Sequence, residues 1–312
     1  MPGDLEQLDG AARKRIDSAC DFLNHKLADQ RKRLTLVAAW ATFGGATMVT
    51  LLKLPLWGVL WFAVPIFLIF AVRAHNEVRR WFKTMVVQRV IAALGDGYAY
   101  THTSSFTREH FLAMDLFSDR TDIFSSEDEV NGRHKEIAFA LHEVRAAKRE
   151  KRGKNTRTIV FFRGTIVVVE FNKHFYGHTT VVPQAEHAVL SGLFGEFDSR
   201  RGRERMSMQD AEFEKAYTVY STDAQQAHYL LTPKLMQLML ETRAQLGGEL
   251  RFAFHQNQLY VAVPSTRNRF EVSLFTTRVT PEQVLGDLAA ATHLAQNLIS
   301  GLDLETRIWT RV

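Results

Sequence analysis

The sequence predicts an α+β protein with an amphipathic N-terminal helix, a two-helix transmembrane hairpin, and a cytoplasmic antiparallel-sheet domain with flanking helices. Three observations lead to this fold class. Two uncharged apolar runs of membrane-spanning length lie near the N-terminus. Runs rich in β-branched and aromatic residues follow in the distal part. Helices with clear start signals alternate with those runs.

Composition and charge narrow the class of protein. The chain of 312 residues is long enough for one large or two modest domains. Its single cysteine, Cys20, excludes an intramolecular disulfide framework and a multi-cysteine zinc site. The net charge of +5 divides into +1 from residues 1–33, +1 from Lys53 and +3 from residues 73–100, so residues 101–312 sum to zero. A basic excess beside apolar segments is typical of membrane topology and argues against nucleic-acid binding.

Residues 1–33 are predicted to form an amphipathic cytoplasmic helix. Within residues 4–30, apolar side chains recur at steps of three and four. This stripe could bind a membrane surface, bind a partner, or pack on the protein's own cytoplasmic domain. The apolar positions are Leu5, Leu8, Ala12, Ile16, Ala19, Leu23 and Leu27.

Residues 34–72 are predicted to form the transmembrane hairpin. The runs 34–52 and 54–72 are each 19 residues long and uncharged, about 28 Å of helix. Lys53 and Pro55 interrupt them and predict a reversal. The rival interpretation is a single or re-entrant span, with the other run buried in protein.

The hairpin is predicted to anchor the protein without conducting anything across the membrane. Ala38, Ala41 and Gly45 would let the two helices approach closely, and Pro65 is expected to kink the second. Neither run contains an ionisable residue, which argues against a channel or transporter.

Flanking charge sets the expected orientation. Basic residues precede the first run and follow the second, so both termini are predicted to be cytoplasmic. Residues 1–30 lack the apolar core of a cleavable signal peptide. The expected location is the bacterial inner membrane, with two passes. The topology-setting residues are Arg31, Lys32, Arg33, Arg73, Arg79, Arg80 and Lys83.

Residues 73–97 are predicted to continue as a juxtamembrane helix that ends at the Gly95-Asp96-Gly97 stop, and residues 98–312 to form the cytoplasmic α+β domain.

Thr232-Pro233 and Thr280-Pro281 mark helix starts, with stops at Gly247-Gly248 and Gly301. Predicted strands cover residues 137–142, 158–162, 165–171, 216–220, 250–254, 259–263 and 270–275, and Arg163-Gly164 reads as a two-residue hairpin turn. Residues 166–169 are apolar on both faces, which predicts a covered strand.

Several strings together resemble a known family. They are LFSDRTDIFSSEDEVNGR, FFRGTIVVVEF, EFEKAYTVYSTDAQQAHYLLTPKLMQLM, the expected hairpin RFAFHQNQLYVAVP, and LDLETRIWT. With the two apolar runs before them, they resemble the bacterial membrane-protein family catalogued as domain of unknown function 3137, over roughly residues 70–312. The resemblance implies a membrane-anchored protein without assigned activity. It also implies a LemA-type membrane protein as a partner, and it supplies no catalytic residue.

No motif in the sequence identifies a reaction. Phosphate-binding loops, the GxSxG elbow and HExxH are all missing. His174 and His178 lie in a turn-like context, which favours a structural pair over metal ligands. Glu127-Asp128-Glu129, beside Asp119 and Asp122, lacks calcium-loop spacing and favours a solvated face. We therefore expect no catalytic, metal-binding or cofactor-binding residues and no cofactor.

One basic run is the candidate contact for anionic lipid or for a partner. Its residues are Arg145, Lys148, Arg149, Lys151, Arg152, Lys154 and Arg157. The alternative interpretation is a flexible loop that charge keeps soluble. Nucleic acid is not expected, because no aromatic residues are interleaved with the run.

The sequence thus favours a membrane-anchored, non-enzymatic interaction or scaffold module of a bacterial inner-membrane assembly, and an oligomer is compatible with it. One alternative is a membrane-bound, hydrolase-like enzyme that uses His102, His110 or His142 with carboxylate neighbours. Another is a sensor of anionic lipid headgroups.

Overall fold

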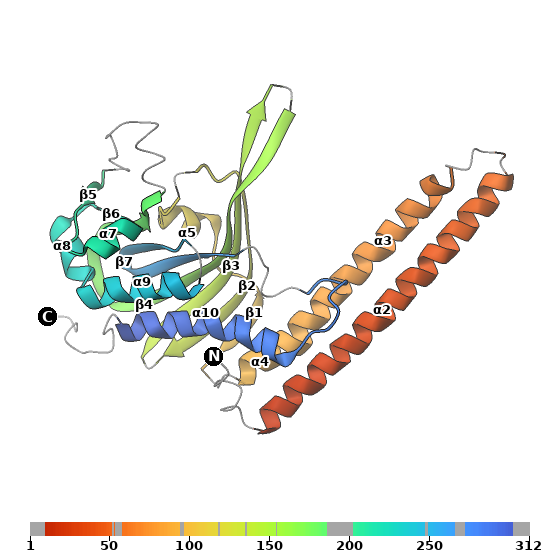
Figure 1. The fold of residues 1–312 in the computed structure, drawn as a ribbon, viewed down its shortest axis with the longest axis horizontal. Coiled ribbons are helices and arrows are strands. Elements are labelled where there is room, and N and C mark those ends of the chain that lie inside the picture. Colours follow the sequence, from red (N-terminus) through yellow and green to blue (C-terminus); the bar gives the residue numbers. More distant parts are fainter. Residues whose placement is uncertain are drawn as a thin grey trace. The chain divides into compact units, whose positions relative to one another are not determined.

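The computed structural model describes residues 10–51, 53, 58–93, 97–117, 119–134, 136–153, 155–185, 202–246, 249–265 and 272–301 (Figure 1). It divides into two compact units. The first contains Met1–Gly95 and Arg269–Leu288, and the second contains Asp96–Asn268 and Ala289–Val312. The mixed α+β class predicted from the sequence is confirmed: long N-terminal helices precede an antiparallel sheet with flanking helices.

The first unit is built on a pair of long helices. Helix α2 (Gly10–Leu51) is followed by α3 (Gly58–Trp81), the π-helix η1 (Phe82–Val87) and α4 (Gln88–Ala93). Helix α2 runs without a break through position 34, so the expected N-terminal helix and the first apolar run are one helix. The helix that follows the second apolar run likewise continues as expected, and its predicted Gly95-Asp96 stop lies outside the described residues.

The part of this helix pair that precedes the first apolar run and follows the second is covered by other segments of the chain. Ile16, Leu23 and Leu27 on α2 are at most 1% exposed, and Val78 and Val86 on the returning helices are fully buried. Gln30 Nε2 donates to Glu77 Oε2 at 2.8 Å across the pair. From Ile16 to Leu27 the N-terminal apolar stripe therefore packs within the first unit, on the protein's own helices, and Leu5 and Leu8 lie outside the described residues. This is nearest to the third alternative, with helices of the first unit in place of the cytoplasmic domain.

The apolar part of the same pair is exposed. Trp40 is 73% exposed, Phe43 70%, Leu51 77% and Trp61 72%. The two helices are long and apolar enough to cross a membrane. They meet at Gly45, where a Cβ would lie 3.1 Å from Val59 Cγ1. The predicted close approach through a small residue is confirmed there.

The second unit contains an antiparallel sheet with seven strands among the described residues. They are β1 (Ala99–Thr103), β2 (Ile123–His134), β3 (Ile137–Arg152), β4 (Asn155–Pro183), β5 (Glu204–Met206), β6 (Tyr217–Ser221) and β7 (Arg251–Pro264). The order is β1-β2-β3-β4-β6-β5, and β7 pairs with β4 off this path. Long β4 is thus the centre of the sheet, which explains why residues 166–169 are buried as predicted.

Five helices, from 6 to 21 residues long, accompany the strands among the described residues. They are α5 (Arg108–Ala113), α7 (Ala211–Ala216), α8 (Ala224–Leu230), α9 (Pro233–Leu246) and α10 (Pro281–Gly301). Both predicted helix starts are confirmed. Thr232 Oγ1 accepts from the Leu235 amide at 3.3 Å, and Thr280 Oγ1 accepts from the Gln283 amide at 3.4 Å.

The predicted hairpin turn at Arg163-Gly164 is wrong. Strand β4 passes straight through both residues, and the chain reverses instead beside Gly153, which has φ +63°. At Gly164 the backbone of β7 comes so close that a Cβ would lie 2.0 Å from Val263 O. This glycine is needed because two strands approach each other closely. Glycine is also common in turns, so the sequence does not distinguish the two roles.

Two further strand predictions need correction. The string RFAFHQNQLYVAVP is one strand, β7, with the residue Gln256 at φ +56° among register shifts, and not a hairpin. In the predicted strand 270–275, residues 272–275 form no strand, and Leu274 and Phe275 lie in a turn. Apolar and polar residues alternate over these few positions. This alternation does not distinguish a strand from a loop that buries every second side chain.

Candidate functional site

A cluster of hydrogen-bonded polar side chains surrounds a bulge in β2. The register of β2 against β3 shifts between Glu127 and Glu129, and Asp128 takes φ +46°. Such a bulge redirects neighbouring side chains. Asp128, fully buried, accepts a hydrogen bond from Tyr100 Oη at 2.5 Å. Burial and this carboxylate together raise the pKa of the Tyr100 phenol.

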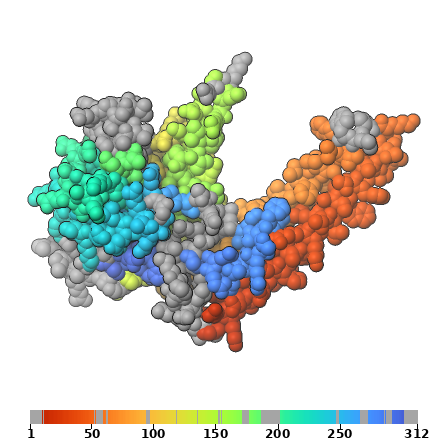
Figure 2. All heavy atoms as spheres, viewed as in Figure 1, coloured from red at the N-terminus to blue at the C-terminus, as the bar shows by residue number. Residues whose placement is uncertain are grey.

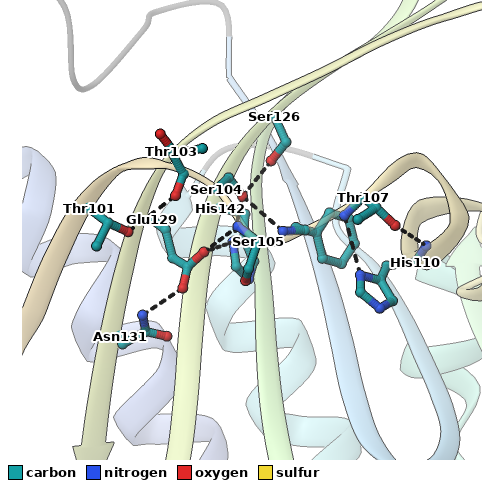
Figure 3. A network of polar contacts seen from close by, with 11 residues as sticks. Thr101, Thr103, Ser104, Ser105, Thr107, His110, Ser126, Glu129, Asn131 and His142 are labelled. Atoms are coloured by element: carbon teal, nitrogen blue, oxygen red, sulfur yellow. Dashed lines mark hydrogen bonds and ion pairs between the residues drawn. The ribbon is translucent and has the colours of Figure 1, made fainter.

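Glu129 is held by two hydrogen bonds, and the imidazole of His142 lies beside the same carboxylate (Figure 3). The Ser105 amide donates to Oε2 at 2.5 Å, and Asn131 Nδ2 donates to Oε1 at 2.6 Å. His142 Nδ1 lies 3.6 Å from Oε2. Burial alone would raise the pKa of Glu129, but these hydrogen bonds and the imidazole lower it overall. The carboxylate therefore stays charged in a nearly enclosed position.

His142 is the buried centre of the cluster, at 3% exposure. Its ring stacks on Phe106 with a centroid distance of 5.0 Å, and Nδ1 lies 2.9 Å from Ser104 Oγ. Ser104 in turn accepts from Ser126 Oγ at 2.7 Å. Burial lowers the pKa of His142 to about 4, against the opposing effect of the Glu129 carboxylate. The imidazole is neutral at physiological pH.

The arrangement differs from a Ser-His-acid triad. In a triad the serine and the acid engage opposite nitrogens of the imidazole, so that the base can pass a proton. Here Ser104 Oγ and Glu129 Oε2 both lie at Nδ1 of His142. The cluster instead ties the segment after β1 to β2 and β3.

The other histidines considered as catalytic lie at the same end of the sheet but have structural contacts. His110 Nδ1 accepts from the Thr107 amide at 3.2 Å and completes the capping box of α5. His102 stacks edge-on against Tyr100, with a centroid distance of 5.1 Å. The sequence suggested these three histidines separately, whereas the fold places them around one loop.

The distal histidines and the acidic cluster are also engaged by protein groups. His178 stacks on His255 at 4.7 Å, while the side chain of His174 lies outside the description. Asp119 accepts from Lys148 Nζ at 2.8 Å. Among the described residues, no three His, Cys, Asp or Glu side chains are grouped as a metal site. The solvated-face interpretation is wrong for Asp128 and Glu129, because the bulge turns both into the protein.

The basic run folds into a two-stranded arm, which we define as residues 148–157 and call the basic arm (Figure 1). The arm projects from the surface of its unit (Figure 2). Lys148 pairs with Ile159 in the β3–β4 ladder, and Glu150 pairs with Arg157. The β2 pairing of β3 ends at Ala147, and β7 joins β4 only from Gly164. Within the described strands the basic arm therefore has no neighbour on either edge. The interpretation of this run as a flexible loop is wrong.

The basic arm concentrates charge. Six basic residues against Glu150 give +5 over residues 148–157, so the rest of residues 101–312 carries −5. Arg149, Lys151 and Arg157 are exposed. Lys154 and the side chain of Arg152 are not among the parts of the chain that the structure describes. Arg145 lies outside the arm, because it pairs with Arg163 within the sheet.

The base of the arm is anchored. The Arg149 amide donates to Asp122 Oδ2 at 2.8 Å, which is the main reason for the lowered pKa of Asp122. Lys148 is held by Asp119 as described, and the pKa of Lys148 is raised by that hydrogen bond. The arm therefore leaves the sheet from a fixed base.

The residues expected to set topology differ in their surroundings. Lys32, Arg33, Arg73 and Arg80 are exposed, and Arg79 is half-buried. Arg33 also pairs with Asp29 at 3.1 Å. Lys83 is only 8% exposed inside the π-helix. The guanidinium of Arg31 donates hydrogen bonds to the backbone carbonyls of Leu274 and Thr276.

Sequence reasoning missed Ser104, Ser105, Ser126 and Asn131. Ser104 and Ser105 lie just after β1, while Ser126 and Asn131 lie on β2, whose polar string SSEDE follows Ile123-Phe124 without apolar alternation. Only the pairing of β2 between β1 and β3 brings these side chains to His142. No periodic signal in the sequence could have indicated the network.

Comparisons with known proteins agree with the resemblance seen in the sequence. Residues 160–304 match the family described as protein of unknown function, DUF3137. No curated protein matches the chain. Among solved structures, the chain is similar to the crystal structure of the mycobacterial trehalose monomycolate transport factor A, TtfA, with 13% identity and a TM-score of 0.34, over 64% of this chain and 88% of that one. A similarity this loose carries no argument about function.

Proposed function

Starting from a chain whose residues 160–304 belong to the DUF3137 family, we propose that the protein is a membrane-anchored, non-enzymatic interaction module. Helices α2 and α3 cross a bacterial inner membrane, and both termini lie on the cytoplasmic side. The sheet unit lies in the cytoplasm and binds an acidic protein partner through the basic arm. The family resemblance makes a LemA-type membrane protein the first partner to test.

The observation that carries the anchor is the change in burial along one helix pair. Before position 34 the apolar stripe from Ile16 to Leu27 is enclosed, with Leu23 fully buried. Beyond it Trp40, Phe43 and Trp61 are at least 70% exposed. Large apolar side chains gain about 1.5–3 kcal/mol each when they leave water. Soluble monomers rarely expose a contiguous apolar surface of this kind, whereas a bilayer covers it.

The non-enzymatic part of the proposal rests on the His142 cluster. A general base needs access to substrate and a pKa near the working pH. His142 is buried, its pKa is lowered, and its Nδ1 is shared by two neighbours. The geometry favours a structural role over the hydrolase-like alternative.

The partner contact is assigned to the basic arm because of charge and shape. A ribbon with exposed Arg149, Lys151 and Arg157 offers guanidinium and ammonium donors on both faces. Charge complementarity increases association rates and discriminates between partners. An acidic surface is the fitting counterpart.

The topology can be tested with cysteine labelling of the full chain in intact cells. Cys20 is buried, so Cys20→Ala gives a background for single cysteines at Lys53 and Tyr229, the latter 50% exposed. A membrane-impermeant maleimide should label Lys53→Cys in cells with a permeabilised outer membrane, and Tyr229→Cys only after lysis. Labelling in the reverse order would overturn the proposed orientation.

The partner contact can be tested by crosslinking in native membranes followed by mass spectrometry. The variant Arg149→Glu, Lys151→Glu, Arg157→Glu should lose crosslinks to an acidic protein. A control with the same charge change on exposed α2 positions, Arg13→Glu, Lys14→Glu, Arg15→Glu, should keep them.

Two results would contradict this assignment. One is purification of the wild-type chain alone under several mild detergent conditions. The other is retention of protein crosslinks by the arm variant together with loss of binding to phosphatidylglycerol vesicles, which would instead support the lipid-sensor alternative.

A further inference from the structure

The segment 272–280 lies against helix α2, within the first unit. The side-chain amide of Asn24 makes two bonds to one residue: Nδ2 donates to Val279 O at 2.9 Å, and Oδ1 accepts from the Val279 amide at 2.8 Å. Arg31 Nε donates to Leu274 O at 2.9 Å, and its Nη2 donates to Thr276 O. Four hydrogen bonds thus fix this segment on the helix.

The side chains of the segment divide sharply between inside and outside. Val272 is 8% exposed, Leu274 3% and Val279 3%. Phe275, between the two carbonyls that Arg31 binds, is 81% exposed, the highest value among the large exposed hydrophobic side chains of the described chain. The segment therefore holds one aromatic ring outward on a fixed backbone.

The position of Arg31 gives the depth of that ring along the helix. Arg31 precedes Leu34, the first residue of the apolar run, by three residues, or about 4.5 Å of helix. The polar headgroup layer is about 5–7 Å thick on each side of the hydrocarbon core. The backbone on both sides of Phe275 is thus bound by a residue that lies within one headgroup-layer thickness of the start of the apolar run, measured along the helix.

The charge around this level also fits a membrane surface. Lys32, Arg33 and Arg73 are exposed beside the start and end of the apolar runs, and Arg278 is exposed on the segment itself. Basic side chains near an anionic leaflet each contribute on the order of 1 kcal/mol. Interfacial segments bury Phe, Trp and Leu side chains about 5–10 Å into the boundary between headgroups and acyl chains, with basic side chains on their polar face.

We propose that segment 272–280 is an interfacial anchor that inserts Phe275 into the headgroup region of an anionic bilayer, with Arg31 as the residue that positions it. The distant segment then fixes the depth and rotation of the helix pair. This inference rests on the proposed membrane anchor and adds a third contact with lipid, far from the spans in sequence.

The test uses the full chain in the Cys20→Ala background, reconstituted into phosphatidylcholine vesicles with and without phosphatidylglycerol. Single cysteines carry an environment-sensitive fluorophore, and spin labels on the lipids quench it at a shallow or a deep position. Phe275→Cys should give blue-shifted emission that the shallow spin label quenches. Adding Arg31→Ala should return this emission toward that of water.

Two control positions separate this inference from the anchor itself. Val64→Cys, at 46% exposure in the middle of the second apolar run, should be quenched by the deep label. Ser18→Cys, exposed and about 24 Å of helix before Leu34, should behave as in water.

Each unfavourable outcome has a distinct meaning. Quenching at Val64 with water-like emission at Phe275 overturns the interfacial anchor alone. Blue-shifted emission at Phe275 that no lipid label quenches shows that protein covers the ring, and also overturns it. Water-like emission at both positions overturns the membrane anchor and this inference together.

Discussion

At the scale of single residues, burial decides what an ionisable side chain can do. His142 and Glu129 form a pair that looks reactive by composition, yet His142 is 3% exposed and Glu129 7%. Their hydrogen bonds to Ser104, Ser105 and Asn131 satisfy groups that would be costly to leave unpaired. The cluster therefore contributes stability to the sheet, and that stability depends on pH.

The pH dependence can be predicted from His142. Its pKa is lowered to about 4 in the folded protein, against about 6.5 when unfolded. Between these values the unfolded chain binds a proton that the folded chain does not, so stability falls as the pH falls from about 6.5 to about 4, by at most about 3 kcal/mol. Glu129, whose pKa is also lowered, adds a loss below about pH 4.5.

The variant His142→Asn should flatten this dependence between pH 6.5 and 4, measured by denaturant unfolding of the full chain in detergent. Asparagine keeps a polar group near Nδ1 and does not titrate. His228→Asn, at an exposed position, should retain the wild-type profile. Identical profiles for wild type and His142→Asn would refute the assignment.

Two glycines make a second prediction at residue scale. Gly164→Ala should lower the free energy of unfolding by about 3 kcal/mol or more, because its Cβ would overlap Val263 O. Gly286→Ala, where helix α10 leaves open space, should raise it by about 0.5–1 kcal/mol. Chemical denaturation of both variants measures the difference, and equal effects would contradict the close approach of β4 and β7.

At the scale of elements, helix α2 and strand β3 each change their neighbours partway along an unbroken backbone. Helix α2 is buried by protein in its first part and exposes Trp40 and Phe43 in its second. Strand β3 lies between β2 and β4 up to Ala147 and then continues as one strand of the arm. In both cases the backbone is uninterrupted, and only the partners change.

Adjacent glycines in α2 test the packing of the helix pair. Gly45→Leu should push the helices apart and cost about 1–3 kcal/mol, because its side chain meets Val59. Gly44→Leu, whose Cβ has nothing within 4 Å, should have little effect. Thermal unfolding in detergent, followed by helical circular dichroism, measures both. A lower midpoint for Gly44→Leu than for Gly45→Leu would count against this helix contact.

At the scale of the whole molecule, the proposal makes the chain an integral membrane protein. Alkaline carbonate should leave it in the membrane pellet, and detergent should release it, as followed by immunoblotting. Replacing Trp40, Phe43, Trp61 and Leu68 by lysine should shift it out of the pellet, because charge at membrane depth is costly. A monomeric wild-type chain in the soluble fraction without detergent would refute the anchor.

Sequence alone predicted features that are local in the chain. The capping signals at Thr232 and Thr280 act over three residues, and the apolar runs and the strand 166–169 show in composition. These predictions succeeded because helix caps, hydropathy and side-chain alternation depend on neighbours in sequence. The strings also showed the family resemblance, which we drew over roughly residues 70–312 and which the family match supports over residues 160–304.

Tertiary structure alone decided the features that depend on distant partners. A glycine marks a turn at Gly153 and a close approach of two paired strands at Gly164, and only the position of β7 distinguishes the two cases. The polar string of β2 became a buried network because β1 and β3 enclose it. Segment 272–280 became a loop fixed on α2 through Asn24 and Arg31, some 250 positions away. Long-range pairing selects among the structures that a local pattern permits, and it is not encoded in any short stretch of sequence.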